Sequence, residues 1–232
     1  MTPEEVREHL EQIARTGGAV LFGVADLSRV EDQSGEVRLA GLTTGISFGY
    51  KLSDVVIEGI VDHPTRTYQY HYRQVNILLD QIGLRIAGYL EEGGHVAFPV
   101  PSSQVVDWDK FTGHISHRVV ARSAGLGWIG RNNLLVNYRY GSRVRYATVL
   151  TDLRLPFDRP VEIDCGSCRA CISACPGGAI GEGPAQFDLR RCIETMDRIR
   201  KPANIGSRIC GICVRACVGK RNGFTLRRGD GA

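Results

Sequence analysis

The sequence contains the run Cys165-Gly-Ser-Cys168-Arg-Ala-Cys171-Ile-Ser-Ala-Cys175-Pro176, which decides the fold of the C-terminal part of the chain. Its spacing, C-x2-C-x2-C-x3-C-P, brings three neighbouring thiolates to one iron–sulfur cluster and sends the fourth to a second cluster. Four cysteines within eleven residues that end in Cys-Pro are typical of such clusters. We therefore expect an iron–sulfur centre here.

The remaining cysteines continue the pattern after a longer insertion. Cys192 is followed by Cys210-Gly-Ile-Cys213-Val-Arg-Ala-Cys217. This arrangement predicts a ferredoxin-like module with two [4Fe–4S] clusters. The predicted ligands are Cys165, Cys168, Cys171 and Cys217 for one cluster and Cys175, Cys192, Cys210 and Cys213 for the other. Val218 stands where a ferredoxin usually has proline, which predicts a changed turn with the ligand kept.

Zinc and disulfides are the alternatives for these thiols. The chain has eight cysteines, and none precedes position 165. Two zinc sites with four cysteines each would use the same eight thiolates, although zinc ribbons favour separated C-x2-C knuckles. Disulfides would be expected in a short secreted chain, with the cysteines spread more widely. Crowding into the last third of the chain favours a metal centre.

Composition places the chain among globular proteins. Hydrophobic residues make up 43% and charged residues 23% of its 232 residues, and the net charge is +4. No apolar run reaches the roughly 18 to 20 residues that a membrane-spanning helix needs, and no secretory signal opens the chain. We expect a cytoplasmic protein without a membrane partner. The segment from Arg190 onward has eleven Lys/Arg against three Asp/Glu, which predicts either a docking face or a solvated basic face.

The pattern before the cysteines predicts an α+β fold. A helix is expected at the N-terminus, with Thr2 as N-cap and Glu5 completing a capping box. A long helix is expected from Pro64 to the Gly93-Gly94 pair, and a short one over 116–125. Strands are expected over 18–28, 42–52, 95–101 and 143–153. A proline-rich connection at 155–160 predicts a boundary between a domain over 1–155 and a second over 156–232, which is too short to fold without metal.

Gly125-Leu-Gly127-Trp128-Ile129-Gly130 satisfies the G-x-G-x-x-G pattern, and Asp152 follows about twenty residues later. A dinucleotide fingerprint must follow a strand and open a helix, whereas here a helical segment precedes the glycines and a strand-like segment follows. The alternatives are a cofactor-binding turn of another kind and a turn that lets the backbone pack closely, with Trp128 simply buried.

At this point the sequence resembles a known family. Residues 124–158, AGLGWIGRNNLLVNYRYGSRVRYATVLTDLRLPFD, followed by CGSCRACISACPGGAI and FDLRRCI, are similar to epoxyqueuosine reductases, which are relatives of the reductive dehalogenases. The match covers roughly residues 110–218. It implies a nitroreductase-like domain that has exchanged flavin for cobalamin, fused to the two-cluster domain. It also implies electron flow through the clusters to cobalt, which attacks the substrate, and a possible homodimer.

The resemblance and the polar residues together suggest a site. His114 and His117, expected three apart on one helix face, and Tyr72, which follows Tyr70 and His71, are candidate proton donors; local capping or packing is the alternative for each. Arg131 and Arg145 are further candidates for binding the phosphate or amide groups at the periphery of a large cofactor. The candidates for cofactor binding are Ser116, Gly127, Trp128, Ile129, Gly130 and Arg143.

One position departs from the family. The acid that serves as proton donor in epoxyqueuosine reductases corresponds to Phe111, with Asp107 and Asp109 close but out of register. The D-x-H-x-x-G motif is absent, so any cobalamin would bind without that histidine as lower ligand. Few residues follow Cys217 in this sequence, so we expect no C-terminal tRNA-binding region.

Three functions follow from these observations. The first is a corrinoid-dependent reductase that takes electrons from a donor protein or low-potential reductant and passes them to a small organic molecule. The second is an electron carrier or corrinoid-activating reductase, whose substrate would be a corrinoid protein. The third is epoxyqueuosine reduction in tRNA, which the missing acid disfavours; a nucleic-acid partner is therefore not expected.

Overall fold

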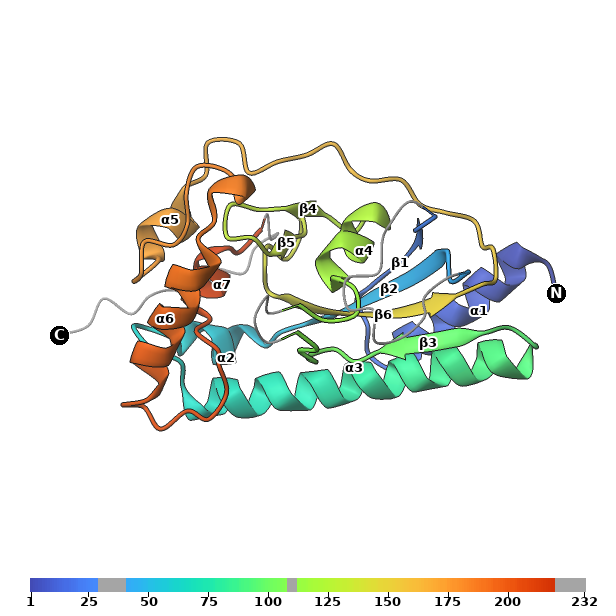
Figure 1. Ribbon diagram of the computed structural model, residues 1–232, viewed down its shortest axis with the longest axis horizontal. Helices are drawn as coiled ribbons and strands as arrows, with labels where there is room; N and C mark the ends of the chain where they lie inside the picture. The colour runs from blue at the N-terminus through green and yellow to red at the C-terminus, as the bar shows by residue number, and fades with distance from the viewer. Residues whose placement is uncertain (29–40, 108–111, 220–232) are drawn as a thin grey trace.

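The structure is a computed structural model that describes residues 1–28, 41–107 and 112–219. An antiparallel sheet forms its centre, helices cover both faces of the sheet, and the cysteine-rich segment lies at one end (Figure 1). The chain therefore has a mixed α and β fold, as expected. Among the described residues, no helix combines the length and the apolar character needed to cross a membrane.

The sheet has the strand order β1-β2-β6-β3. Its strands, all predicted from the sequence, are β1 (Leu21–Asp26), β2 (Thr44–Lys51), β3 (Ala97–Val100) and β6 (Val144–Thr151). β2 pairs with β6 over their full lengths. β3 lies at an edge, where Pro99 does not interrupt a central ladder, and the prediction of an edge strand is confirmed.

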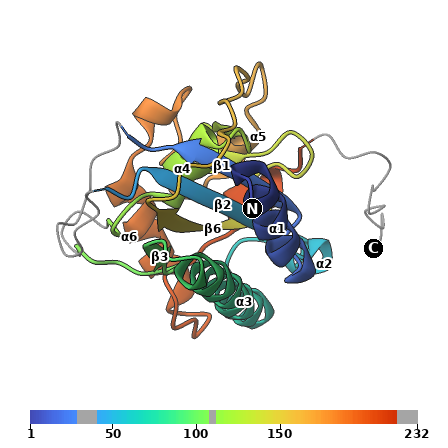
Figure 2. The ribbon, with the colours of Figure 1, turned by 90° about the vertical axis from the view of Figure 1, so that its right-hand side faces the viewer.

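Two helices cover one face of the sheet (Figure 2). The first, α1 (Pro3–Thr16), begins with the predicted capping box, in which Glu5 N donates to Thr2 Oγ1 at 3.2 Å and Thr2 N donates to Glu5 Oε2 at 2.7 Å. The second, α3 (Arg66–Glu92), ends at Gly93 as predicted. Apolar side chains recur along α3 at three- and four-residue steps, and they pack on the buried residues of β2 and β6.

The opposite face carries α4 (His117–Ser123) and a small hairpin of β4 (Trp128–Ile129) and β5 (Leu135–Val136). We expected His114 and His117 to lie on one face of a helix, but α4 begins only at His117. Ser116 has an extended backbone, with φ −79° and ψ 112°, so the helix cannot continue back to His114. The expectation of a shared helix face was wrong for this pair.

The cysteine-rich end packs directly on the rest of the chain. It contains α5 (Ala170–Ala174), the 3-10 helix η1 (Pro184–Gln186), α6 (Leu189–Arg200) and α7 (Ile212–Ala216), and α7 contacts α2 (Asp54–Glu58). Four of its aliphatic side chains belong to the same core cluster as Ile60 and Tyr68: Ile205, Ile209, Ile212 and Val214. The division at residue 155 stays a prediction, because one apolar core extends across it.

Candidate functional site

The first predicted group of cysteines is brought together around α5 and the end of α7. Burial raises the pKa of the Cys171 thiol to about 11, and the neighbouring thiols of Cys217, Cys165 and Cys168 add to that rise. These thiols therefore act on Cys171 in the folded chain, where α5, which carries Cys171, packs against α7, which ends at Cys217. Cys168 is exposed, whereas Cys171 is buried.

The second predicted group gathers beside the first, between α6 and α7. Burial raises the pKa of Cys192 to about 11, with contributions from Cys210 and Cys175. Burial also raises the pKa of Cys213, and the thiols of all three of these cysteines add to the rise, as does Cys171 of the first group. The two predicted sets of thiols therefore lie next to each other, since Cys213 of one set is affected by Cys171 of the other, and the assignment of ligands to each cluster stays a prediction.

The donor chemistry of each group fits an iron–sulfur cluster. Four thiolates are the ordinary ligand set of a [4Fe–4S] cluster, whose corners hold the sulfur ligands further apart than a single ion does. Within the ranges that the structure describes, no three His, Cys, Asp or Glu side chains lie close enough together to hold one metal ion. Four cysteines are also a ligand set for zinc, so the choice of an iron–sulfur cluster stays a prediction from the sequence spacing.

The glycine-rich turn lies against the first cysteine group. The indole N–H of Trp128 donates to Cys165 Sγ at 3.4 Å. A Cβ on Gly130 would come within 3.5 Å of the same sulfur and 2.5 Å of Val136 Cγ2. Neither these residues nor the intervening Ile129 lines the large cavity described below. The turn allows close packing next to a cluster ligand, which is the role that glycine serves where backbone must approach closely.

Arg143 is also placed away from the cavity. Its side chain is almost fully buried, and its Nη1 donates to Asp54 Oδ1 at 3.0 Å. Its Nη2 donates to Glu58 Oε1 at 2.5 Å and to the carbonyl of Arg215 at 2.6 Å. Arg143 therefore ties β6 to α2 and to α7, the helix that carries Cys213. The structure gives this arginine a different set of partners from the cofactor that the sequence suggested.

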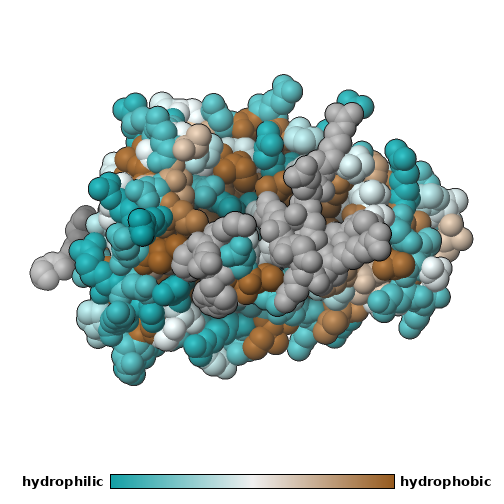
Figure 3. Space-filling view, in the orientation of Figure 1, coloured by the Kyte–Doolittle hydropathy of each residue, from teal (hydrophilic) through white to brown (hydrophobic). Residues whose placement is uncertain are grey.

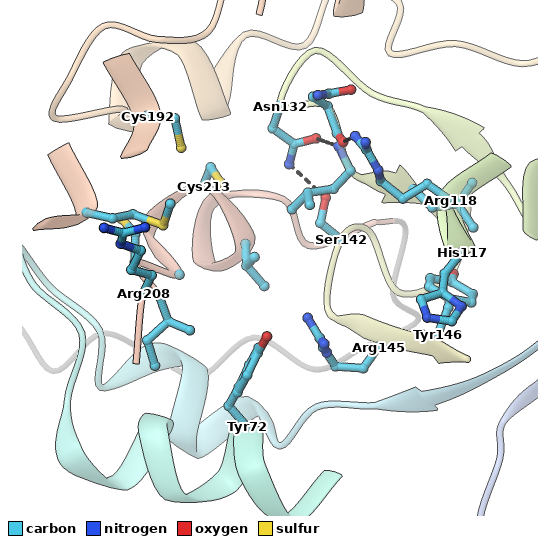
Figure 4. A pocket seen from close by; sticks show the side chains of 18 of the residues that line it. Tyr72, His117, Arg118, Asn132, Ser142, Arg145, Tyr146, Cys192, Arg208 and Cys213 are labelled. Carbon is cyan, nitrogen blue, oxygen red and sulfur yellow. Dashed lines mark hydrogen bonds between the residues drawn. The ribbon is translucent and has the colours of Figure 1, made fainter. Parts of the chain in front are cut away.

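A cavity of about 510 Å³ lies between the sheet and the cysteine-rich end. One wall includes the second cysteine group, and the others come from α3 and from the segments 100–102, 113–118, 132–135 and 144–146 (Figure 4). Its volume is in the range of cofactor and substrate sites. Hydrophilic side chains dominate the surface at this end of the molecule, with apolar ones showing between them (Figure 3).

Tyr72 and Arg145 form the wall opposite the cysteines (Figure 4). The Arg145 guanidinium lies 4.3 Å from the centre of the Tyr72 ring, and Asn76 Oδ1 accepts from its Nε and Nη2 at 3.1 and 2.9 Å. Burial alone would raise the pKa of the Tyr72 phenol. The charge of Arg145 and hydrogen bonds with Ser103, Asn76 and Arg145 together bring that pKa below its ordinary value of 10.

His117 also lines the cavity, but both nitrogens of its ring are engaged. Nε2 lies 3.1 Å from the carbonyl of Pro101, which can only accept, so Nε2 carries the proton and Nδ1 accepts from Thr148 Oγ1 at 2.9 Å. Burial lowers the pKa of His117 to about 4. The imidazole is therefore neutral near pH 7, which makes it a weaker proton donor than Tyr72.

This low pKa predicts how stability depends on pH. In the unfolded chain His117 takes up a proton below about pH 6.5, whereas the folded chain resists protonation down to about pH 4. Between these values the parent protein should lose stability as the pH falls, by up to about 1.4 kcal/mol for each pH unit. His117→Gln should flatten that part of the curve, which urea unfolding at several pH values would measure. An unchanged slope in the variant would contradict the assignment.

The comparisons with known proteins agree with the resemblance seen in the sequence. No family model matches the chain. Epoxyqueuosine reductase of Bacillus anthracis is 36% identical over 114 residues, which cover 46% of this chain and 30% of that protein. The enzyme of Salmonella typhimurium is 49% identical over 79 residues, 34% of this chain and 20% of that protein. The chain is similar to epoxyqueuosine reductases. It spans at most about a third of the length of these curated relatives.

Solved structures extend the similarity to nearly the whole fold. A catabolic reductive dehalogenase in complex with 3-bromo-4-hydroxybenzoic acid has a TM-score of 0.75 at 20% identity, over 93% of this chain and 32% of that one. Epoxyqueuosine reductase from Streptococcus thermophilus has a TM-score of 0.66 at 20% identity, over 92% and 65%. Another epoxyqueuosine reductase, with a TM-score of 0.64 at 22% identity over 92% and 64%, is in complex with a modified tRNA stem loop. Our expectation that nucleic acid is not a partner therefore gains no support.

The cavity brings together several of the site residues predicted from the sequence. Tyr72, His114, Ser116 and His117 line the cavity, and His114 is buried with its ring edge-on to Phe98 at a centroid distance of 5.2 Å. Phe111 and Asp109 lie outside the described residues, and Asp107 forms a bridge with Thr112. Sequence reasoning missed Arg118 and Tyr146, whose neighbours in the chain, His117 and Arg145, were the available signal.

Proposed function

We propose that the chain is a corrinoid-dependent reductase that carries two [4Fe–4S] clusters. The observation that carries the proposal is the cavity, because one wall is made by four cysteines of one predicted cluster and the opposite wall by a tyrosine–arginine pair. A cofactor between these walls would adjoin both an electron source and a proton source. The partly apolar lining suits a corrinoid ring, and the volume, which is that of a drug-sized ligand site, would hold part of such a cofactor.

The proposal includes the domain layout expected from the sequence. Residues 1–155 would form a nitroreductase-like domain, for which the antiparallel sheet with helices on both faces is the support. Residues 156–232 would form a ferredoxin-like domain, supported by the two groups of four thiols. Metal would contribute to the stability of that second part, because its ligands converge only in the folded chain.

The residues of this chain would handle the proton and exclude water. Cobalamin bound in the cavity would supply a strongly reducing cobalt centre to an organic substrate. The Tyr72 hydroxyl holds a proton that the substrate needs when it gains electrons, and Arg145 stabilises the phenolate left behind. Apolar side chains keep solvent from that proton. They are Leu52, Val100, Ile115, Leu134, Leu135 and Val144.

Exposure of Cys168 favours electron delivery from outside and also supports a second candidate function. Residues 166–170 are all exposed, so a cluster held by Cys168 would lie near solvent. In the reductase this is the entry point for electrons from a donor protein or a low-potential reductant. The same exposure would serve an electron carrier or corrinoid-activating protein, whose substrate would be another protein.

An anaerobic cobalamin titration of the cluster-reconstituted chain separates these functions. The reductase predicts tight one-to-one binding with a base-off spectrum, read by absorption and cobalt EPR. Ser116 lines the cavity and makes no side-chain capping bond, so Ser116→Trp should block the cavity without loss of iron. Ser116→Ala serves as the matched control and should bind normally. Absence of binding to a chain with both clusters intact would refute the reductase and leave the carrier.

A further inference from the structure

The lining of the cavity, in the described part of the chain, contains guanidinium groups but no carboxylate. Three arginines line it, namely Arg118, Arg145 and Arg208, together with His114 and His117. Within the part of the chain that the structure describes, no aspartate or glutamate belongs to the lining. Asp80 lies behind the wall, where it accepts hydrogen bonds from the backbone N–H and the hydroxyl of Ser102. Arg208 pairs with Asp197 at 3.1 Å.

Arg118 and Arg145 differ from the other arginines that are shielded from solvent. Arg145 donates to the side-chain oxygen of Asn76 and to the carbonyl of Ser102, and Arg118 donates to the carbonyl of Asn133. These partners are neutral. Every other buried or half-buried arginine among the described residues has a carboxylate oxygen at 3.9 Å or less: Arg7, Arg131, Arg143, Arg200 and Arg215.

A second observation concerns Tyr146, which is buried and lines the same cavity. Its hydroxyl has no hydrogen-bond partner within the described residues. Burial raises the pKa of this phenol, so the hydroxyl keeps its proton. A buried hydroxyl without a partner costs free energy unless something in the site accepts its hydrogen bond. The guanidinium groups of Arg118 and Arg145 thus line the cavity together with Tyr146, whose hydroxyl is shielded from solvent and lacks an acceptor (Figure 4).

We propose that the cavity binds a ligand through an anionic group, a carboxylate or a phosphate. Arg145 is the principal partner of that group, and Arg118 and Tyr146 contribute. An anionic group would give Arg145 and Arg118 the charged partner that the other shielded arginines find in the chain's own carboxylates. The inference rests on the proposed function in taking the ligand to be the substrate or the corrinoid. The anion would then be a substrate carboxylate or the phosphodiester of the cobalamin nucleotide.

The test compares charged and neutral probes of one shape. Calorimetry on the cluster-reconstituted chain measures binding of benzoate and of benzamide, without and with bound cobalamin. We expect benzoate to bind about tenfold or more tightly than benzamide. Arg145→Met should abolish this preference, and Arg145→Lys should retain part of it. Arg122→Met, an exposed change on α4, is the matched control and should change nothing.

Tyr146→Phe adds a readout that a purely structural role would not give. Removing a hydroxyl without a partner should leave stability unchanged or raise it, while benzoate affinity falls. Iron content and circular dichroism of each variant check that it is folded. A Tyr146→Phe variant that loses stability and keeps its benzoate affinity would remove this residue from the site.

Binding measurements with two corrinoids, cobalamin and cobinamide, identify which molecule carries the anionic group. Cobinamide lacks the phosphodiester of cobalamin, so an Arg145→Met variant that binds cobalamin more weakly and cobinamide equally well assigns the anion to the corrinoid. A benzoate preference that persists with cobalamin bound assigns it to the substrate. Equal affinities for benzoate and benzamide, with corrinoid affinities indifferent to Arg145→Met, would overturn the inference. Failure of the parent chain to bind either corrinoid would refute the reductase instead, and the benzoate comparison would still decide the charge.

Discussion

Replacing Cys213 by serine is expected to lower the iron content of the reconstituted chain from about eight to about four atoms. Cys213 lies in α7, and its thiol is grouped with those of Cys192, Cys210 and Cys175. A serine hydroxyl is a much poorer ligand for iron than a thiolate. The cluster beside the cavity should be lost, while the other four thiols are left intact. Iron and sulfide analysis with EPR of the reduced protein would measure the change.

Double variants test the grouping itself. Cys168→Ser combined with Cys171→Ser removes two ligands from one predicted cluster and should cost about four iron atoms. Cys168→Ser combined with Cys213→Ser touches both clusters and should remove nearly all the iron. Ser167→Ala, a change at an exposed position in the same loop, is the control and should retain the full content. Equal losses in the two double variants would contradict the assignment of ligands.

Arg143→Gln is expected to destabilise the chain by about 3 kcal/mol. Arg143 is almost fully buried between Asp54, which is largely buried, and the more exposed Glu58. Removing the guanidinium takes one of two cations from the Asp54 carboxylate, which still pairs with Lys51, and it frees the carbonyl of Arg215 in α7. Most of the loss should come from the Asp54 pair, because solvent screens Glu58. Thermal unfolding should show a midpoint lower by about 6 to 12 °C.

Two further variants separate the ion pairs from a general packing defect. Arg85→Gln lies on the exposed side of α3 and should change stability by no more than about 0.5 kcal/mol. Adding Asp54→Asn and Glu58→Gln to Arg143→Gln removes the two carboxylates that have lost the Arg143 guanidinium and should recover part of the loss. A triple variant as unstable as Arg143→Gln alone would show that packing, rather than charge, explains the effect.

Local patterns were sufficient to predict much of the fold. The capping box at Thr2, the periodicity of α3 and the four strands of the sheet depend on residues close together in sequence, and all were confirmed. The predicted start of α4 was wrong for a local reason, because the extended backbone of Ser116 prevents the helix from reaching back to His114. Local sequence patterns predict that a helix or strand exists, but its terminal residues depend on individual φ and ψ angles.

The sequence by itself was enough to predict which cysteines share a cluster, because the spacing of three ligands within seven residues leaves the chain few ways to arrange them around one centre. Only the tertiary structure decided which neighbouring polar residues face the cavity. Arg143 and Arg145 are two apart in one strand, yet the first binds Asp54 and Glu58 while the second lies over Tyr72. Trp128 likewise donates to Cys165, 37 residues away. Such roles depend on partners distant in the chain, which no local pattern encodes.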